Sequence, residues 1–187
     1  MAKLIYITGG ARSGKSSFAE QQAARYKKVA YIATAKCTDQ EMAVRINRHR
    51  QQRPAHWQTI EEQYQPYVSI TESEADAILL DCLSIWVSNL VLQYWDDQQG
   101  FLCSAPDLID RVLSEVEKLV AAAAVYQGTL IIVSNEVGSG IVPVSPLARL
   151  YRDCLGLCNQ KIAASADLAY WCVSGIPVLL KEGGHEK

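Results

Sequence analysis

A glycine-rich segment near the start of the chain has the residue types and spacing of a phosphate-binding loop. Residues 9–16 fit the pattern G-x-x-x-x-G-K-[ST]. Small residues let the backbone curl so that N–H groups point at phosphate oxygens, and the N-terminus of the next helix adds a positive dipole end. In this pattern Lys15 reaches the β- and γ-phosphates and the Ser16 hydroxyl ligates Mg²⁺. The segment therefore predicts nucleoside triphosphate binding through Gly9, Gly10, Ala11, Arg12, Ser13, Gly14, Lys15 and Ser16.

An acidic residue further along the chain is the second candidate. Asp81 directly follows the apolar run at residues 78–80, which is typical of a buried strand. A carboxylate at the tip of such a strand can reach a metal ion, as the second acidic group of P-loop proteins does. Asp81 could instead cap the helix that follows. Both interpretations stay open, so Ser16 and Asp81 are the candidate Mg²⁺ ligands.

A basic segment around His49 is the third candidate. Residues 45–53 hold four arginines and one histidine, which could be a solvated basic face with an incidental histidine. Alternatively, the arginines bind phosphate groups, and their positive field keeps the imidazole of His49 neutral near pH 7. A neutral imidazole is a competent nucleophile toward phosphorus. His56 is the other histidine nearby, and we expect it to be structural because it lies beside Trp57.

These candidate residues need a scaffold that brings their segments to one edge. Short, continuously apolar runs predict strands, and helical segments separate most of them. The pattern is typical of an α/β fold: a P-loop (RecA-like), mostly parallel sheet with helices on both faces and an antiparallel edge strand. We expect a single nucleotide-binding domain over residues 1–187. Strands are predicted at 4–8, 29–33, 77–80, 129–133, 168–173 and 177–181, and helices at 15–26, 39–52, 85–94, 106–126 and from 146 to about 162.

Composition excludes several classes of protein. Eighteen lysines and arginines against twenty acidic residues give a net charge of −2, which argues against a protein built to hold nucleic acid. No stretch reaches the 18 apolar residues of a membrane span, and the start of the chain does not have the pattern of a signal peptide. The six cysteines form no C-x-x-C pair. We therefore expect reduced, buried thiols in a cytoplasmic protein.

Taken together, the motifs resemble one family. They are TGGARSGKS at 8–16, YIATA at 31–35, the arginine and histidine segment at 45–57, the run ending at Asp81, NEVGSGIVP at 135–143, and segments at 148–160 and 173–175. The chain resembles the bifunctional adenosylcobinamide kinase / adenosylcobinamide-phosphate guanylyltransferase family of cobalamin biosynthesis over about residues 4–181. The P-loop alone is generic, whereas its combination with the basic segment and NEVGSGIVP is specific.

The resemblance implies two reactions on a corrinoid. ATP or GTP phosphorylates adenosylcobinamide, and GTP then donates GMP to adenosylcobinamide phosphate. The family's guanylyl-accepting histidine corresponds to His49, and the family forms a homotrimer. Besides the P-loop, the nucleotide contacts that the resemblance implies are Thr34, Ala35, Lys36, Arg50, Gln51, Gln52, Arg53, Glu61 and Asp81.

Three other functions use the same phosphate loop. A P-loop small-molecule kinase without transferase activity would not explain a histidine among four arginines. A RecA-like ATPase stimulated by nucleic acid fits the net charge poorly. A GTP switch would read guanine through N-K-x-D, which residues 159–162 do not match. Guanine must therefore be read differently, and we expect Glu61 or Asp81 to accept hydrogen bonds from its N1–H and 2-amino groups.

Overall fold

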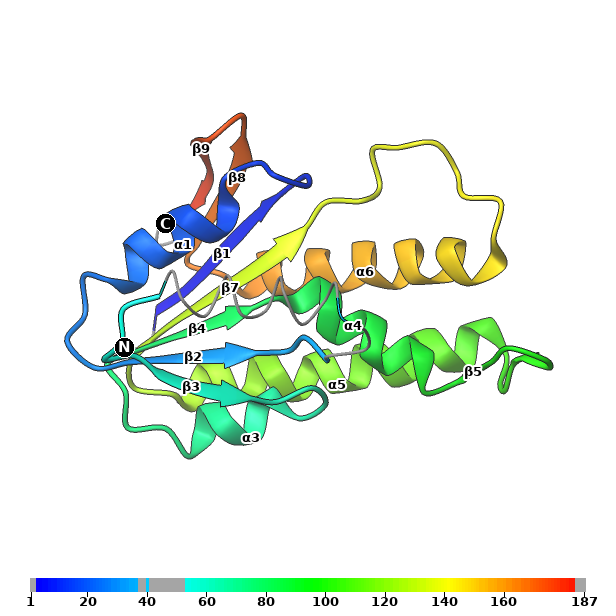
Figure 1. Cartoon of the computed structure of the whole chain (residues 1–187), viewed down its shortest axis with the longest axis horizontal. Helices are drawn as coiled ribbons and strands as arrows, with labels where there is room; N and C mark the ends of the chain where they lie inside the picture. The colour runs from blue at the N-terminus through cyan, green and yellow to red at the C-terminus, as the bar shows by residue number, and fades with distance from the viewer. Residues whose placement is uncertain (1–2, 37–39, 41–52, 184–187) are drawn as a thin grey trace.

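The structure is a computed structural model that describes residues 3–36, 40 and 53–183. The described residues form a seven-stranded sheet in the order β3-β2-β4-β7-β1-β8-β9, in which every neighbouring pair is parallel except the antiparallel pair of β8 and β9. This confirms the predicted fold class (Figure 1). The strands of this sheet are β1 Lys3–Gly9, β2 Val29–Ala33, β3 Gln58–Glu61, β4 Ala77–Asp81, β7 Thr129–Asn135, β8 Leu168–Val173 and β9 Ile176–Glu182.

Helices cover both faces of the sheet, as Figure 1 shows. On one face α1 contacts β1, β4 and β7, whereas α4 and α6 pack on the other face together with α5 and α3. Two hydrophobic cores result, one on each side of the sheet. The helices are α1 Lys15–Ala23, α3 Pro66–Thr71, α4 Leu83–Leu92, α5 Ala105–Val125 and α6 Pro146–Ser165.

The strand β1 shows why the sheet needs two covered faces. Along it, Leu4 and Tyr6 belong to the core under α4, α5 and α6, whereas Ile5 and Ile7 belong to the core under α1. Successive side chains of a strand point to opposite faces, so a continuous apolar run is stable only between two layers. Full burial of each such side chain contributes about 1.5–3 kcal/mol. The same run ends at Gly9, where the phosphate loop begins.

Some elements differ from the expectation. The edge strand β3, the short helix α3, and a small hairpin of β5 Trp95–Asp96 with β6 Gly100–Phe101 were not predicted. These elements are short. The strand β3 pairs on one side only, its residues are partly exposed, and its sequence has no apolar run. The helix α1 ends at Ala23 rather than at residue 26. The predicted helix at 39–52 falls almost wholly outside the described residues.

The cysteines of the described segments are free thiols. Four of them are buried and Cys103 is half-buried. Burial raises the pKa of Cys82 and of Cys154 to about 11 and that of Cys158 to about 12, which makes these thiols poor nucleophiles. None of the helices in the described ranges combines the length and the apolar character needed to cross a bilayer.

Candidate active site

The phosphate loop lies between β1 and α1 and has the curled backbone that the motif requires. Arg12 and Gly14 adopt positive φ angles of 57° and 91°, and the Ser13 N–H donates to the Gly10 carbonyl at 3.3 Å. Lys15 is the first residue of α1 and is half-buried. Its ammonium donates to the Gly10 carbonyl at 2.9 Å. The lysine is therefore held over the loop, as a phosphate ligand must be.

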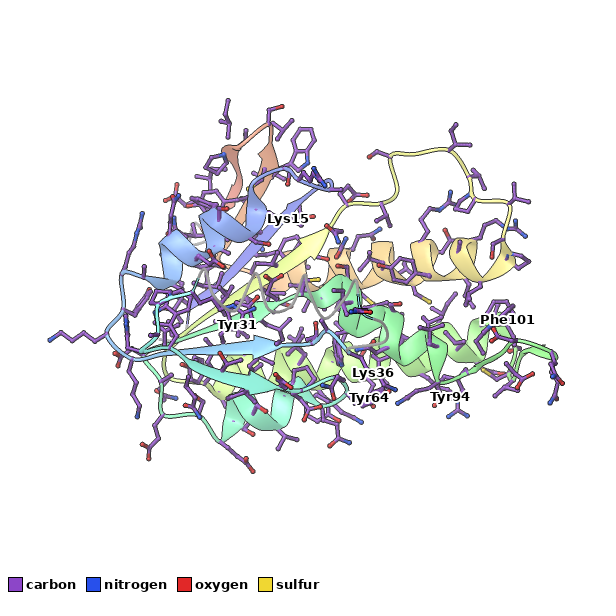
Figure 2. All side chains as sticks on the ribbon, viewed as in Figure 1. Lys15, Tyr31, Lys36, Tyr64, Tyr94 and Phe101 are labelled. Atoms are coloured by element: carbon purple, nitrogen blue, oxygen red, sulfur yellow. The ribbon has the colours of Figure 1, made fainter. Side chains whose placement is uncertain are left out.

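Lys15 is half-buried and lies within the electrostatic reach of Asp81. Burial lowers the pKa of Lys15, and nearby Cys82, Asp81 and Cys172 act in the opposite direction. Figure 2 shows Lys15 at the start of α1. The charge of Asp81 therefore acts on Lys15, although the two residues are 66 positions apart in the chain.

The turn between β8 and β9 packs against the phosphate loop. The Gly175 N–H donates to the Ser13 carbonyl at 3.0 Å. A Cβ on Gly14 would lie 2.9 Å from the Gly175 Cα, and a Cβ on Gly9 would lie 2.5 Å from the Cys172 carbonyl oxygen. Two glycines of the motif are thus required by close packing against β8 and its turn. Sequence reasoning did not link these segments, because no local pattern reports a contact between them.

Asp81 ends β4 at the carboxyl edge and faces α1. It accepts a hydrogen bond from the Tyr31 hydroxyl at 2.7 Å. The Arg53 guanidinium carbon lies 3.3 Å from the centre of the Tyr31 ring. Burial, and then the charge of Asp81, raise the pKa of Tyr31 far above its ordinary value. The N-cap of α4 is Cys82, without a side-chain cap hydrogen bond, so the geometry favours Asp81 as a site carboxylate rather than a helix cap.

The second predicted carboxylate, Glu61, lies on the edge strand β3, and β2 separates this strand from β4. Ala33 of β2 pairs with Asp81 on one side and with Glu61 on the other. Strands are spaced by about 4.8 Å, so the Cα atoms of the two carboxylates are roughly 10 Å apart. Ile60 and Leu80 pack into the core on the opposite face, and alternation along each strand therefore directs Glu61 and Asp81 to the α1 side.

The segment after β2 passes along the same edge. Thr34 is fully buried, and its hydroxyl donates to the Cys82 carbonyl at 2.9 Å and accepts from the Cys82 N–H at 3.0 Å. Its side chain is therefore engaged in the fold, and its backbone N–H donates to the Asp81 carbonyl at 3.4 Å. Ala35 is half-buried, and Lys36 is exposed beyond the end of β2 (Figure 2).

The basic segment is only partly described. Arg53 is described and lies at the site, on the Tyr31 ring. Trp57 is buried in the core beneath α1, whereas His56 is exposed. The other candidates of this segment, His49, Arg50, Gln51 and Gln52, lie outside the described residues. Their predicted roles therefore remain predictions.

A polar network beneath this edge was missed by sequence reasoning. The Asn135 carboxamide, at the end of β7, donates to the Ser84 hydroxyl at 3.0 Å. Asn159 of α6 accepts from Ser134 at 2.7 Å and donates to the Asn135 carbonyl at 3.1 Å. Because β7 lies between β4 and β1, the network holds the strand that separates Asp81 from the phosphate loop. Asn159, a polar residue on the otherwise apolar buried face of α6, is the sequence signal that could have revealed this network.

The oxygen donors at this edge suit a hard divalent cation. Ser16 offers a hydroxyl in the first turn of α1, and Asp81 a carboxylate on the strand tip that faces α1. Mg²⁺ is usually bound through one or two such protein ligands together with substrate phosphates. The described residues contain no cluster of three or more histidine, cysteine or acidic side chains that could hold a metal by themselves. The donors therefore fit a metal ion that arrives with the nucleotide.

Comparison with known proteins finds one family model and several similar proteins. The family model described as cobinamide kinase / cobinamide phosphate guanyltransferase matches residues 5–180. The bifunctional adenosylcobalamin biosynthesis protein CobU of Escherichia coli (strain K12) is 39% identical over 95% of this chain and 99% of its own. CobU of Salmonella typhimurium is 41% identical over 95% and 99%, and CobP of Pseudomonas aeruginosa is 42% identical over 94% and 95%. The solved RadB recombinase matches with a TM-score of 0.48 and 15% identity over 90% of this chain and 73% of its own.

Proposed function

The chain belongs to the cobinamide kinase / cobinamide phosphate guanyltransferase family, and we propose that it performs both reactions of that family with His49 as the guanylyl-accepting residue. The enzyme phosphorylates adenosylcobinamide and then transfers GMP from GTP to adenosylcobinamide phosphate. The observation that carries this conclusion is the family match over residues 5–180, joined to a P-loop lysine and a carboxylate in one site.

The kinase step needs the phosphate loop and an incoming hydroxyl. Phosphoryl transfer requires little covalent chemistry from the protein, so catalysis rests on positioning and on charge stabilisation. Backbone N–H groups of residues 9–16 and the Lys15 ammonium hold the β- and γ-phosphates of ATP or GTP. Ser16 and Asp81 would hold Mg²⁺, which would neutralise charge on these oxygens when bound. The aminopropanol hydroxyl oxygen of the corrinoid then attacks the γ-phosphorus, the bond to the nucleoside diphosphate breaks, and the hydroxyl proton is released.

The transfer step needs a nucleophile near the α-phosphorus. An imidazole nitrogen of His49 attacks the α-phosphorus of GTP, an N–P bond forms, and the bond to pyrophosphate breaks. The corrinoid phosphate then attacks the same phosphorus, forms adenosylcobinamide-GDP and releases the imidazole. Arg53 supports this placement, because it lies at the site and four residues span at most about 14 Å of chain. Arg45, Arg48, Arg50 and Arg53 would neutralise the triphosphate and keep the imidazole uncharged.

Asp81 and Glu61 contact different parts of the bound nucleotide. Asp81 is two strands from the phosphate-loop strand β1 and is electrostatically coupled to Lys15, which suits the metal and phosphate end. Glu61 lies two strands further away, at a distance that suits the base. We assign guanine recognition to Glu61 and the metal to Asp81. The remaining contacts come from Thr34, Ala35, Lys36, Arg50, Gln51, Gln52 and Arg53.

Incubation with α-labelled GTP and Mg²⁺, followed by denaturation, tests the covalent step. Wild-type protein should retain label without any corrinoid phosphate, and acid should release the label whereas base should not, as for a phosphoramidate. The His49→Ala variant should retain no label but keep kinase activity. The His56→Ala variant is the matched control and should label normally. Label on His49→Ala, or none on wild type, would contradict the mechanism.

The assembly and the location of the enzyme are part of the proposal. We propose that residues 1–187 form one domain, that the enzyme is a cytoplasmic homotrimer, and that it has no nucleic acid partner. Exposed apolar side chains on β9 support an assembly, because Ile176 and Leu180 are 63% and 61% exposed on an edge strand. The loop from β7 to α6 adds Ile141 and Val144, at 96% and 93%. Exposed apolar side chains on an edge strand are typical of a surface that a partner covers.

A further inference from the structure

We propose that Asn89 is a positioning residue that fixes the segments following β2 and β3 relative to each other and thereby sets the affinity for the guanine base. The proposal rests on the proposed function, because it concerns the same nucleotide site. Asn89 lies in α4, and no part of the motif analysis singled it out.

The Asn89 carboxamide joins two strands at the point where their pairing ends. Its Nδ2 donates to the Thr34 carbonyl at 2.8 Å and to the Gln63 carbonyl at 3.1 Å. The β2–β3 ladder ends at Ala33 and Glu61. Both acceptors are carbonyl oxygens, so the partners themselves require the NH₂ group to face them. One side chain therefore continues the connection between the two segments past the end of the ladder.

Asn89 is a polar residue beside apolar, buried residues of α4. The neighbouring inward residues of α4, among them Trp86, Val87 and Leu90, are buried in the apolar core. A carboxamide on such a helix is costly unless its hydrogen bonds are made. Asn89 makes them to two loops of the site rather than within α4.

The two segments that Asn89 joins carry the proposed base contacts. Thr34 begins the stretch Thr34, Ala35 and Lys36, and Gln63 follows Glu61 by two residues. Thr34 is also held by both backbone groups of Cys82, so its position has independent support. Loss of Asn89 removes one hydrogen bond from each segment, and the Gln63 side carries Glu61. The phosphate loop, four strands away from β3, should be little affected.

The test separates base binding from phosphate binding. Calorimetry on the full chain with Mg²⁺ would measure the dissociation constants of a β,γ-imido GTP analogue and of inorganic tripolyphosphate. Asn89→Ser and Asn89→Asp should weaken the analogue about tenfold, because the donors to two carbonyls are lost or replaced by an oxygen. Tripolyphosphate affinity should change less than twofold. Asn89→Gln, which keeps the NH₂ donors on a longer stem, should recover part of the loss.

A control variant and a measurement of folding accompany the binding experiment. Ser88→Ala, at the adjacent position of α4, should leave both constants unchanged, and thermal unfolding would show that each variant is folded. Equal weakening of the analogue and of tripolyphosphate, or an unchanged analogue constant in a folded variant, would overturn the proposal. Binding decides this point separately from the proposed function, which fails instead if wild-type protein binds GTP but neither phosphorylates adenosylcobinamide nor becomes labelled.

Discussion

At the scale of single residues, the phosphate loop is the part of the site whose chemistry is most tightly constrained. Lys15 is half-buried, donates to the Gly10 carbonyl and has its pKa lowered by burial. It is a poor contributor to folding and a good ligand for concentrated negative charge. Asp81 and Glu61 add two carboxylates with different neighbours, and the charge of Asp81 also acts on a third, Glu20.

Replacement of Lys15 by alanine tests the phosphate site. The Lys15→Ala variant should lose nucleoside triphosphate affinity by about 2–4 kcal/mol, because concentrated phosphate charge is left without its cation. The fold should persist, since the side chain is not part of either core. Titration calorimetry measures the affinity and circular dichroism the fold. An unchanged affinity would mean that residues 9–16 are not the triphosphate-binding loop.

The division of labour between the carboxylates is the second residue-scale prediction. Glu61→Gln should narrow the preference for GTP over ATP in guanylyl transfer, because a carboxylate accepts both guanine donors and an amide does not. Asp81→Asn should impair both nucleotides alike and raise the Mg²⁺ concentration needed for half-maximal rate. Steady-state kinetics with GTP and with ATP distinguishes the effects of the two substitutions. A base preference lost in Asp81→Asn but kept in Glu61→Gln would reverse the assignment.

Glu20 makes stability depend on pH. Burial, followed by the charge of Asp81, raises the pKa of Glu20, and Arg53 opposes the shift. The folded state therefore keeps this proton to a higher pH than the unfolded chain does. The stabilising contribution is present below the unfolded pKa of 4.5 and is lost as pH rises through the folded value. Relative to wild type, Glu20→Gln should gain stability between pH 4 and pH 7 in urea unfolding; a constant difference would contradict this.

At the scale of elements, the β8–β9 hairpin and the phosphate loop form one unit. Gly14 has a φ of 91°, and its added Cβ would meet the Gly175 backbone. Gly14→Ala should therefore lower stability by about 1–3 kcal/mol and weaken nucleotide binding. Gly156→Ala is the matched control, because nothing lies within 4 Å of its Cβ and alanine is favoured in a helix. Denaturant unfolding and calorimetry give both quantities. A Gly14→Ala variant as stable as the control would mean that the turn does not support the loop.

At the scale of the whole molecule, the exposed apolar surface on the edge strand predicts self-association. Wild-type protein should sediment as a trimer. Leu180→Lys places a charge on the exposed face of β9 and should shift the mass toward that of a monomer. Val125→Lys, a control at a residue 62% exposed at the end of α5, should leave the trimer intact. A monomeric wild type would contradict the assembly, and a trimeric Leu180→Lys variant would exclude this surface.

The sequence by itself determined the elements whose signals are local. The P-loop, the strand before it and the helix after it are specified by adjacent residues, because a curled loop needs glycine and small side chains in consecutive positions. Continuous apolar runs identified β1, β2, β4, β7 and β8, since only a sheet covered on both faces buries every residue of a strand. The closing turn before β9 identified the antiparallel edge. The polar edge strand β3 lacks such a run and was not predicted.

Only the tertiary structure decided which distant groups share the site. Strand order and register place Glu61 and Asp81 on either side of Ala33, and no sequence interval encodes that pairing. The contact of Gly175 with the phosphate loop and the hydrogen bonds of Asn89 join segments that are far apart in the chain. A side chain's type reports its own preferences, whereas its partners depend on how the whole sheet and its helices pack. The phosphate-binding function was therefore readable from local spacing, and the residues that position it were not.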